Sequence, residues 1–249
     1  MIVFPMNGRG QRFVDAGYRQ PKFMLELAGT SVFRHVLEGF ASLFGAEQFL
    51  FVMAYDTKIA AFVESECAAM GLTAPLLAIL NAPTRGQAET VALGLEQAAT
   101  DPTEPLTIFN IDTLRPNFAY PKDMDLSRID GYLEVFKCTG DGWSFVRPDS
   151  GIGGRVAETA EKKRISDLCC SGLYHFRSAS LFTESFEAAL GDADWPLVNG
   201  EYYVAPLYNR LIANARDIRY HLITDTEVAF CGTPEQYAEL TRQMENDHG

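Results

Sequence analysis

Residues 5–13 read PMNGRGQRF, and the same stretch continues to Lys22. A short apolar run at residues 1–4 precedes it and is typical of the first strand of a sheet. The two glycines of the stretch lie one residue apart, and glycine lets a backbone turn sharply and approach a ligand closely. Backbone N–H groups followed by the charges of Arg12 and Lys22 suit a polyphosphate. The pattern leaves two interpretations open: a phosphate-binding loop, or an ordinary strand-to-helix turn with solvated basic residues.

The size and charge of the chain limit its possible partners. Its 249 residues are enough for one large α/β domain or two small ones. The net charge of −12 argues against nucleic acid, because binding a phosphate backbone relies on clustered Lys and Arg. No stretch approaches the roughly 18 apolar residues that a membrane span requires. We therefore expect neither nucleic acid nor membrane as a partner.

The cysteine and histidine content predicts a protein without disulfides or zinc. The five cysteines are odd in number and include no Cys-x-x-Cys pair, so buried free thiols in a reducing cytosol are expected. The apolar N-terminal run is too short for a signal peptide, which also favours a cytoplasmic location. The four histidines are scattered, so neither a zinc site nor a histidine-activated nucleophile is indicated.

Strand-like and helix-like segments alternate in the first half of the chain. Apolar runs predict buried strands at residues 1–4, 48–54, 75–80 and 105–111. Helical spacing of apolar residues predicts helices at 31–40, 57–70 and 86–99, the first capped by Ser31. This alternation predicts an α/β fold with a mostly parallel sheet and helices on both faces. Ligands bind at the carboxyl ends of such strands, where the loops after residues 5, 80 and 109 would meet.

The second half of the chain is less regular. Extended segments are predicted at residues 131–138, 142–159, 168–176, 219–222 and 227–231. Helices are predicted at 178–190 and 201–215, and a last helix begins after residues 232–235. No linker divides the chain, so we expect a single domain over 1–249. The change in character divides this domain into a half of about 1–125, which holds the candidate phosphate-binding loop, and a half of about 126–249, which would shape the rest of the site.

Asp112 is the first candidate for metal chemistry. It ends the fourth predicted strand, facing the glycine-rich stretch, and a carboxylate there suits Mg²⁺, which prefers oxygen ligands and shares them with phosphates. The alternative is that Asp112 begins a turn, as aspartate commonly does. The glycine-rich stretch itself is not a Walker A motif, since no Gly-Lys-Ser/Thr follows at the required spacing. It is not a dinucleotide fingerprint either, because Phe13 stands at the third glycine position.

Taken together, the motifs resemble the signature of the sugar-1-phosphate nucleotidyltransferase family, especially its short, single-domain members linked to capsular and surface-polysaccharide synthesis. The resemblance implies a Rossmann-like fold of the GT-A type and covers nearly the whole chain. Besides residues 5–22, it rests on NAPTRGQA at 81–88, ID at 111–112, EK at 161–162, SGLY at 171–174, GEYY at 200–203 and GTP at 232–234.

The resemblance also implies roles for individual residues. Catalysis would depend on Arg12, Lys22 and Asp112, and Asp112 would also hold Mg²⁺. The nucleotide would be bound by Met6, Asn7, Gly8, Gly10, Asn81, Gly86 and Gln87. The acceptor would be bound by Glu161, Lys162, Gly172 and Glu201. For Glu161 the competing interpretation is a solvated face, because it begins a run of charged residues.

The chain departs from the family pattern at two positions. Phe230 stands where many members have a second metal-binding aspartate, and a phenyl ring cannot bind a cation. Asp225 or Glu227, or substrate phosphates and water, would then complete the metal site. Asn7 stands where relatives commonly have a small residue.

The implied reaction joins an NTP to a sugar-1-phosphate, or to a similar phosphorylated sugar or small alcohol, and releases pyrophosphate for the synthesis of surface-polysaccharide precursors. One alternative is a GT-A glycosyltransferase that uses a nucleotide sugar, with residues 110–112 as a degraded Asp-x-Asp motif. Another is a catalytically silent nucleotide- or sugar-binding regulator. The sequence does not reveal the base, the acceptor or the oligomeric state.

Overall fold

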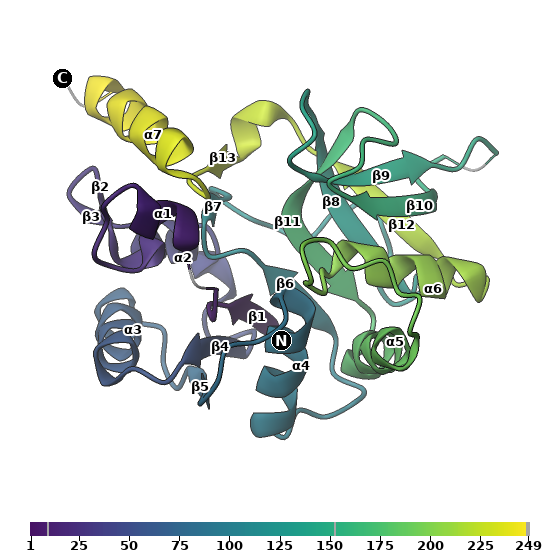
Figure 1. Cartoon of the computed structure of the whole chain (residues 1–249), viewed down its shortest axis with the longest axis horizontal. Helices are drawn as coiled ribbons and strands as arrows, with labels where there is room; N and C mark the ends of the chain where they lie inside the picture. Colours follow the sequence, from purple (N-terminus) through teal and green to yellow (C-terminus); the bar gives the residue numbers. More distant parts are fainter. Residues whose placement is uncertain (9, 152, 248–249) are drawn as a thin grey trace.

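The computed structural model describes residues 1–8, 10–151 and 153–247 and is built around one nine-stranded sheet (Figure 1). In spatial order, seven of its strands are β10 (Val156–Glu161), β9 (Ser144–Pro148), β11 (Leu168–Phe176), β6 (Leu106–Phe109), β1 (Ile2–Pro5), β4 (Phe49–Ala54) and β5 (Leu76–Leu80). The other two are β8 (Gly131–Lys137), which pairs with β11, and β12 (Ile218–Leu222), which pairs with β8.

The strands of the first half are parallel, as their apolar sequences predict. β1 pairs in parallel with both β4 and β6, and β4 pairs in parallel with β5. Successive residues of β1 serve opposite faces: Ile2 and Phe4 belong to one core cluster and Val3 to the other. A strand that is buried on both faces has no position for a polar side chain, which explains the continuous apolar run.

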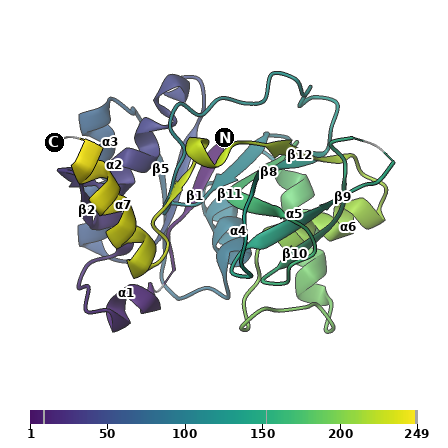
Figure 2. The same ribbon diagram turned by 90° about the horizontal axis from the view of Figure 1, so that it is seen from above.

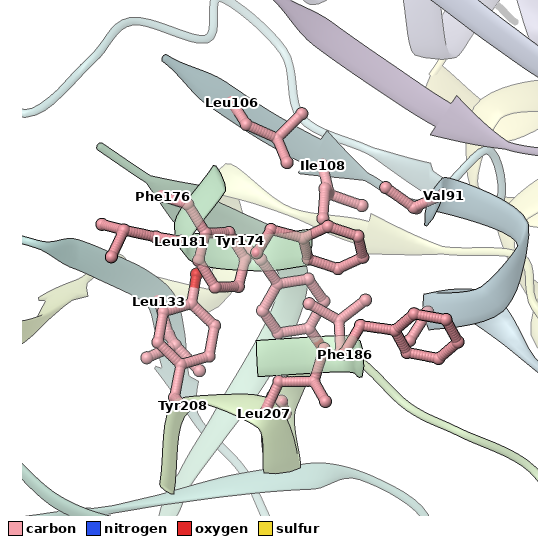
Figure 3. Packing of buried hydrophobic residues seen from close by; sticks show 14 of the residues in the cluster. Val91, Leu106, Ile108, Leu133, Tyr174, Phe176, Leu181, Phe186, Leu207 and Tyr208 are labelled. Atoms are coloured by element: carbon pink, nitrogen blue, oxygen red, sulfur yellow. The ribbon is translucent and has the colours of Figure 1, made fainter. Parts of the chain in front are cut away.

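Helices cover both faces of the sheet, and this confirms the predicted fold class. The Ile2 and Phe4 side is covered by α2 (Val32–Glu38) and α3 (Thr57–Met70). The Val3 side is covered by α4 (Gln87–Gln97), α5 (Ala179–Gly191) and α6 (Tyr208–Ala213). Figure 3 shows the core of this second side, where Val91 of α4 and Phe186 of α5 lie over the sheet. Ser31 caps α2 as expected, since its Oγ accepts a hydrogen bond from the Arg34 N–H at 3.1 Å.

The second half adds antiparallel strands, so the sheet is mixed. β11 pairs antiparallel with β6, β8 and β9, whereas β12 is parallel to β8. The extended segment predicted at 142–159 is the β9–β10 hairpin. The helix predicted from residue 201 begins later, with a 3-10 turn at Ala205–Leu207 that leads into α6. Pro206 explains the difference, because proline is tolerated only in the first turn of a helix.

The last segments return to the first half of the chain. β13 (Ala229–Phe230) pairs antiparallel with β7 (Thr113–Leu114). It is shorter than the strand predicted at 227–231, because Asp225–Glu227 forms a 3-10 turn. α7 (Pro234–Asp247) follows and lies beside α1 (Gln11–Asp15), on the side of α2 and α3 (Figures 1 and 2). The Tyr237 ring of α7 contacts Phe13 of α1, with 6.2 Å between centroids.

The remaining elements are short. They are the hairpin of β2 (Glu26–Leu27) with β3 (Thr30–Ser31), and 3-10 turns at Lys22–Met24 and Ala41–Leu43. Within the described ranges, none of the helices has the length and apolar character needed to cross a bilayer.

The expectation that every cysteine is free is wrong for two of the five. Cys138 and Cys169 form a disulfide, with Cα atoms 6.1 Å apart, whereas Cys67, Cys170 and Cys231 are free and buried. The antiparallel pairing of β8 with β11 brings the two together, because Cys169 lies opposite the end of β8 that Cys138 follows. Their separation of 31 residues gives no Cys-x-x-Cys signal, so the sequence alone does not predict the bond.

The disulfide makes a direct prediction. Under denaturing, non-reducing conditions, an alkylating reagent should label the three free cysteines and spare Cys138 and Cys169. After reduction, peptide mass spectrometry should find all five cysteines labelled. Complete labelling without reduction would contradict the pairing.

A second prediction concerns the packing of α4 on β4. A Cβ added at Gly94 would lie 2.2 Å from Cγ2 of Val52. Overpacking costs about 1–3 kcal/mol, which exceeds the ~0.5–1 kcal/mol that alanine gains over glycine in a helix. We expect Gly94→Ala to lower the free energy of unfolding in urea. Gly191→Ala in α5 is the control, because nothing lies within 4 Å of its added Cβ. Equal losses in both variants would show that the helix–sheet contact is not the cause.

Candidate active site

The glycine-rich stretch forms a loop between β1 and α1, which we call the glycine loop (residues 6–10). Met6 N–H still donates to the Val52 carbonyl at 2.7 Å, so the loop starts directly at the sheet edge. Gly10 has φ of +59°, a left-handed conformation that favours glycine, and its carbonyl accepts the first helical hydrogen bonds of α1. Gly8 is exposed, and Arg9 lies outside the described residues.

The loop at residues 81–86 lies against the glycine loop. Asn7 Nδ2 donates to the Ala82 carbonyl at 3.2 Å. The loop ends at Gly86, whose φ is +109° and whose added Cβ would lie 2.6 Å from the Tyr202 carbonyl. Tyr202 N–H in turn donates to the Arg85 carbonyl at 2.7 Å. The two predicted nucleotide loops therefore meet, and a segment of the second half closes against one of them.

Asp112 and Lys22 meet at the same edge. Lys22 Nζ forms an ion pair with Asp112 Oδ2, and the two side chains are only 28% and 18% exposed. Asp112 follows β6, whereas Lys22 begins the 3-10 turn after α1. The backbone of Asp112 is fixed by the segment that follows β13, because the Cys231 N–H donates to the Asp112 carbonyl at 3.0 Å. Gly232 leaves space for the carboxylate, since an added Cβ would lie 2.9 Å from Oδ2.

Asn110 also lies at this edge, although the sequence indicated it only as part of the degraded Asp-x-Asp motif at residues 110–112. Its Oδ1 accepts a hydrogen bond from Gln87 Nε2 at 2.5 Å, which links β6 to the start of α4. Gly172, with φ of +99°, leaves its side-chain space to Asn110, because an added Cβ would lie 2.5 Å from Asn110 Nδ2. The signal that could have revealed this contact is a polar residue at a strand end beside a glycine-bearing strand.

The acceptor-side candidates form one polar group at the end of β10. Glu161 accepts a hydrogen bond from the Ser144 hydroxyl, and burial raises the pKa of the Glu161 carboxyl. Lys162 Nζ donates to the Tyr203 hydroxyl at 2.7 Å, and that hydroxyl donates to Glu201 Oε2 at 2.6 Å. Glu161 and Lys162 are partly buried, unlike the exposed residues 163–164 that follow them, so this part of the charge run is not a solvated face.

Arg12 lies exposed on α1 and has no ion-pair partner in the described part of the chain. Burial raises the pKa of Tyr203, and the Arg12 charge opposes that rise. Arg12 is therefore within electrostatic reach of the Lys162–Tyr203–Glu201 chain. A backbone hydrogen bond lowers the pKa of the Glu235 carboxyl, and the Arg12 charge adds to this shift. No ion pair holds this guanidinium in the described residues, so it is available for an anionic ligand.

The residues around Asp112 determine how a metal could be held. Phe230 packs against Trp143 and Phe136, with ring centroids 4.6 and 5.0 Å away. Glu227 is bound elsewhere, by Arg115 Nη2 at 3.2 Å, and Asp225 is exposed in its 3-10 turn. Across the residues that the structure describes, no three His, Cys, Asp or Glu side chains form a metal cluster. The single carboxylate of Asp112 nevertheless fits Mg²⁺, which is commonly held by one or two carboxylates together with substrate phosphates.

Known proteins that resemble this chain are found among solved structures. No protein-family model and no curated protein matches the chain. Among solved structures, the nucleoside-diphosphate-sugar pyrophosphorylase from Vibrio cholerae RC9 is 44% identical, with a TM-score of 0.91 over 98% of this chain and 100% of that chain.

Two more distant structures share the fold. The inositol-1-phosphate CTP transferase from T. maritima is 14% identical, with a TM-score of 0.69, and the match covers 98% of this chain and 95% of that chain. A UDP-glucose pyrophosphorylase complexed with UDP-glucose is 16% identical, with a TM-score of 0.75, and the match covers 99% and 98%. The full-length match at 44% identity, together with the motifs gathered at one sheet edge, shows that the chain belongs to the sugar-phosphate nucleotidyltransferase (nucleoside-diphosphate-sugar pyrophosphorylase) family.

Proposed function

We propose that this enzyme joins an NTP to a sugar-1-phosphate, or to a similar phosphorylated sugar or small alcohol, through residues of both halves of the chain. The observation that carries the proposal is the Lys22–Asp112 ion pair, placed at the carboxyl edge of the sheet beside the glycine loop. The nucleotide would bind to residues of about 1–125, on the glycine loop and the 81–86 loop. The acceptor would bind to residues of about 126–249, near Glu161 and Lys162.

The proposed reaction is an in-line displacement at the α-phosphorus of the NTP. An oxygen of the acceptor phosphate forms the new P–O bond, and the bond to the bridging oxygen breaks as pyrophosphate leaves with its electron pair. The attacking oxygen is already anionic at neutral pH, so no general base is needed. The enzyme's contribution is then to position the two phosphates and to stabilise the developing charge.

Arg12 and Lys22 would supply the positive charge. Arg12 forms no ion pair in the described residues, so it can contact a phosphate without breaking one. Lys22 is held by Asp112 and can turn toward a phosphate when the carboxylate gains another cation. Mg²⁺, when bound at Asp112, would neutralise phosphate charge. The thiol of Cys231, which contacts the Asp112 carbonyl, is not expected to hold Mg²⁺, because this cation prefers oxygen ligands.

Glu161, Lys162 and Glu201 would select the acceptor substrate through hydrogen bonds. Glu161 and Glu201 offer carboxylate oxygens to hydroxyl groups, and Lys162 offers an ammonium group. Gly172 supports this region indirectly, since it makes space for Asn110. We place the product among surface-polysaccharide precursors and the enzyme in the cytoplasm, on the resemblance of its motifs to capsular family members.

The test of this function is a pyrophosphate-release screen of four NTPs, with Mg²⁺, against a panel of sugar-1-phosphates and phosphorylated alcohols. We expect pyrophosphate to appear with at least one NTP only when an acceptor is present. A glycosyltransferase would instead release a nucleoside phosphate from a nucleotide sugar. If the protein is a catalytically silent regulator, nucleotide binding would raise the melting temperature of the protein, but no pyrophosphate would be released with any acceptor.

Loss of either member of the central ion pair should reduce turnover. We expect Lys22→Ala and Asp112→Asn each to lower kcat by roughly 10²–10³, the cost of removing one electrostatic group from an active site. Lys58→Ala, at an exposed position at the start of α3, is the matched control and should keep its full rate. Near-normal turnover of a folded Lys22→Ala enzyme would refute the assigned role.

A further inference from the structure

Asn7 is a polar residue that is almost fully buried at the active-site edge of the sheet. It is 8% exposed, and its Nδ2 lies 3.2 Å from the Ala82 carbonyl and 3.4 Å from Thr84 Oγ1. A carbonyl oxygen can only accept a hydrogen bond, so the amide nitrogen must face the 81–86 loop. This contact determines the orientation of the whole carboxamide.

Thr84 continues the connection into α4. Its Oγ1 lies 2.6 Å from Thr90 Oγ1, and Thr90 Oγ1 donates to the Gly86 carbonyl at 3.0 Å. Thr90 is 3% exposed and belongs to α4, so it is a rigid anchor. Hydrogen bonds thus run from Asn7 through Thr84 to α4, and they hold the 81–86 loop between the sheet and the helix.

The oxygen of the Asn7 carboxamide is left available. Its Oδ1 has no hydrogen-bond partner among the described residues. In the same part of the chain, the fully buried side-chain atoms without a hydrogen-bond partner are Asp130 Oδ1 and Tyr132 OH. Asn7 Oδ1 does not belong to this set, so it keeps some exposure, and the hydrogen bond from Nδ2 to the Ala82 carbonyl fixes the orientation of this acceptor.

We propose that Asn7 determines which nucleobase the enzyme accepts. Its Nδ2 holds the 81–86 loop against the glycine loop, and its Oδ1 accepts a hydrogen bond from an N–H group on the edge of the base. This inference rests on the proposed function only in that the ligand is an NTP. A site built to hydrogen-bond an N–H group discriminates strongly against a ligand that lacks it, because its own polar group is then left unpaired.

The experiment measures binding, so it requires no turnover and no acceptor. Dissociation constants of the four NTPs and of inorganic tripolyphosphate are measured by calorimetry for the wild type and Asn7→Ala. We expect Asn7→Ala to weaken the preferred NTP about tenfold, to leave tripolyphosphate within about twofold, and to reduce the preference among the NTPs. An equal loss for tripolyphosphate, or an unchanged preference among the NTPs, would overturn the proposal.

Variants of Thr84 separate the two roles of Asn7. Thr84→Val removes the hydroxyl that anchors the loop but keeps Asn7 Oδ1, so it should weaken all NTPs about threefold and preserve their order. Thr84→Ser keeps the hydroxyl and should bind as the wild type does. Loss of the base preference in Thr84→Val, with its retention in Asn7→Ala, would refute the assignment to Asn7.

A third variant and the turnover screen keep this inference separate from the proposed function. If Asn7→Ala does not fold, as judged by its thermal transition, Asn7→Ser is measured with the same expectations, because serine is too short to reach the 81–86 loop. Nucleotide binding that depends on Asn7 without pyrophosphate release would refute the proposed reaction alone. Pyrophosphate release with a base preference unchanged in Asn7→Ala would refute this inference alone.

Discussion

The pairing of β6 with β11 is the contact on which the rest of the structure depends. Here a parallel sheet built by the first half meets an antiparallel set of strands built by the second, with Phe109 opposite Leu173. The junction continues past the strand end, because the Asn110 N–H donates to the Gly172 carbonyl at 3.2 Å. Only a residue without a Cβ allows the Asn110 side chain to lie there. Both halves therefore share one hydrogen-bonded layer, and Asp112 follows the strand β6 that joins them.

A buried ion pair lies close to the β6–β11 junction. Arg115 and Glu134 are 5% and 1% exposed, and Arg115 Nε lies 3.1 Å from Glu134 Oε2. Ser171 Oγ donates to the same carboxylate at 2.9 Å, next to Gly172. Burial raises the pKa of Glu134, and the Arg115 charge opposes that rise. Buried charges are costly unless fully paired, so this network gains little stability over an apolar core but holds β7, β8 and β11 in one arrangement.

The sequence predicted the parts of this protein that depend on local pattern. Buried parallel strands and amphipathic helices reveal themselves through apolar runs and spacing, and the Ser31 cap through its residue type. Contacts between side chains of different elements have no such signature, so the sequence predicts neither the Cys138–Cys169 bond nor the Gln87–Asn110 contact. The sequence predicts Lys22 and Asp112, 90 residues apart, in one site, because the motifs resemble a known family, but it does not predict their direct ion pair.

The pairing of β7 with β13 has a consequence for the order of folding. Phe230 pairs with Thr113, so the chain between these two residues leaves the first half and then returns to it. Cys231 and Gly232 then complete the surroundings of Asp112, and α7 covers Phe13. During synthesis on the ribosome, the surroundings of Asp112 and Phe13 are therefore incomplete until β13 and α7 have emerged. Partially synthesised chains of this enzyme contain nearly every catalytic candidate, yet they lack the scaffold that holds Asp112 in place.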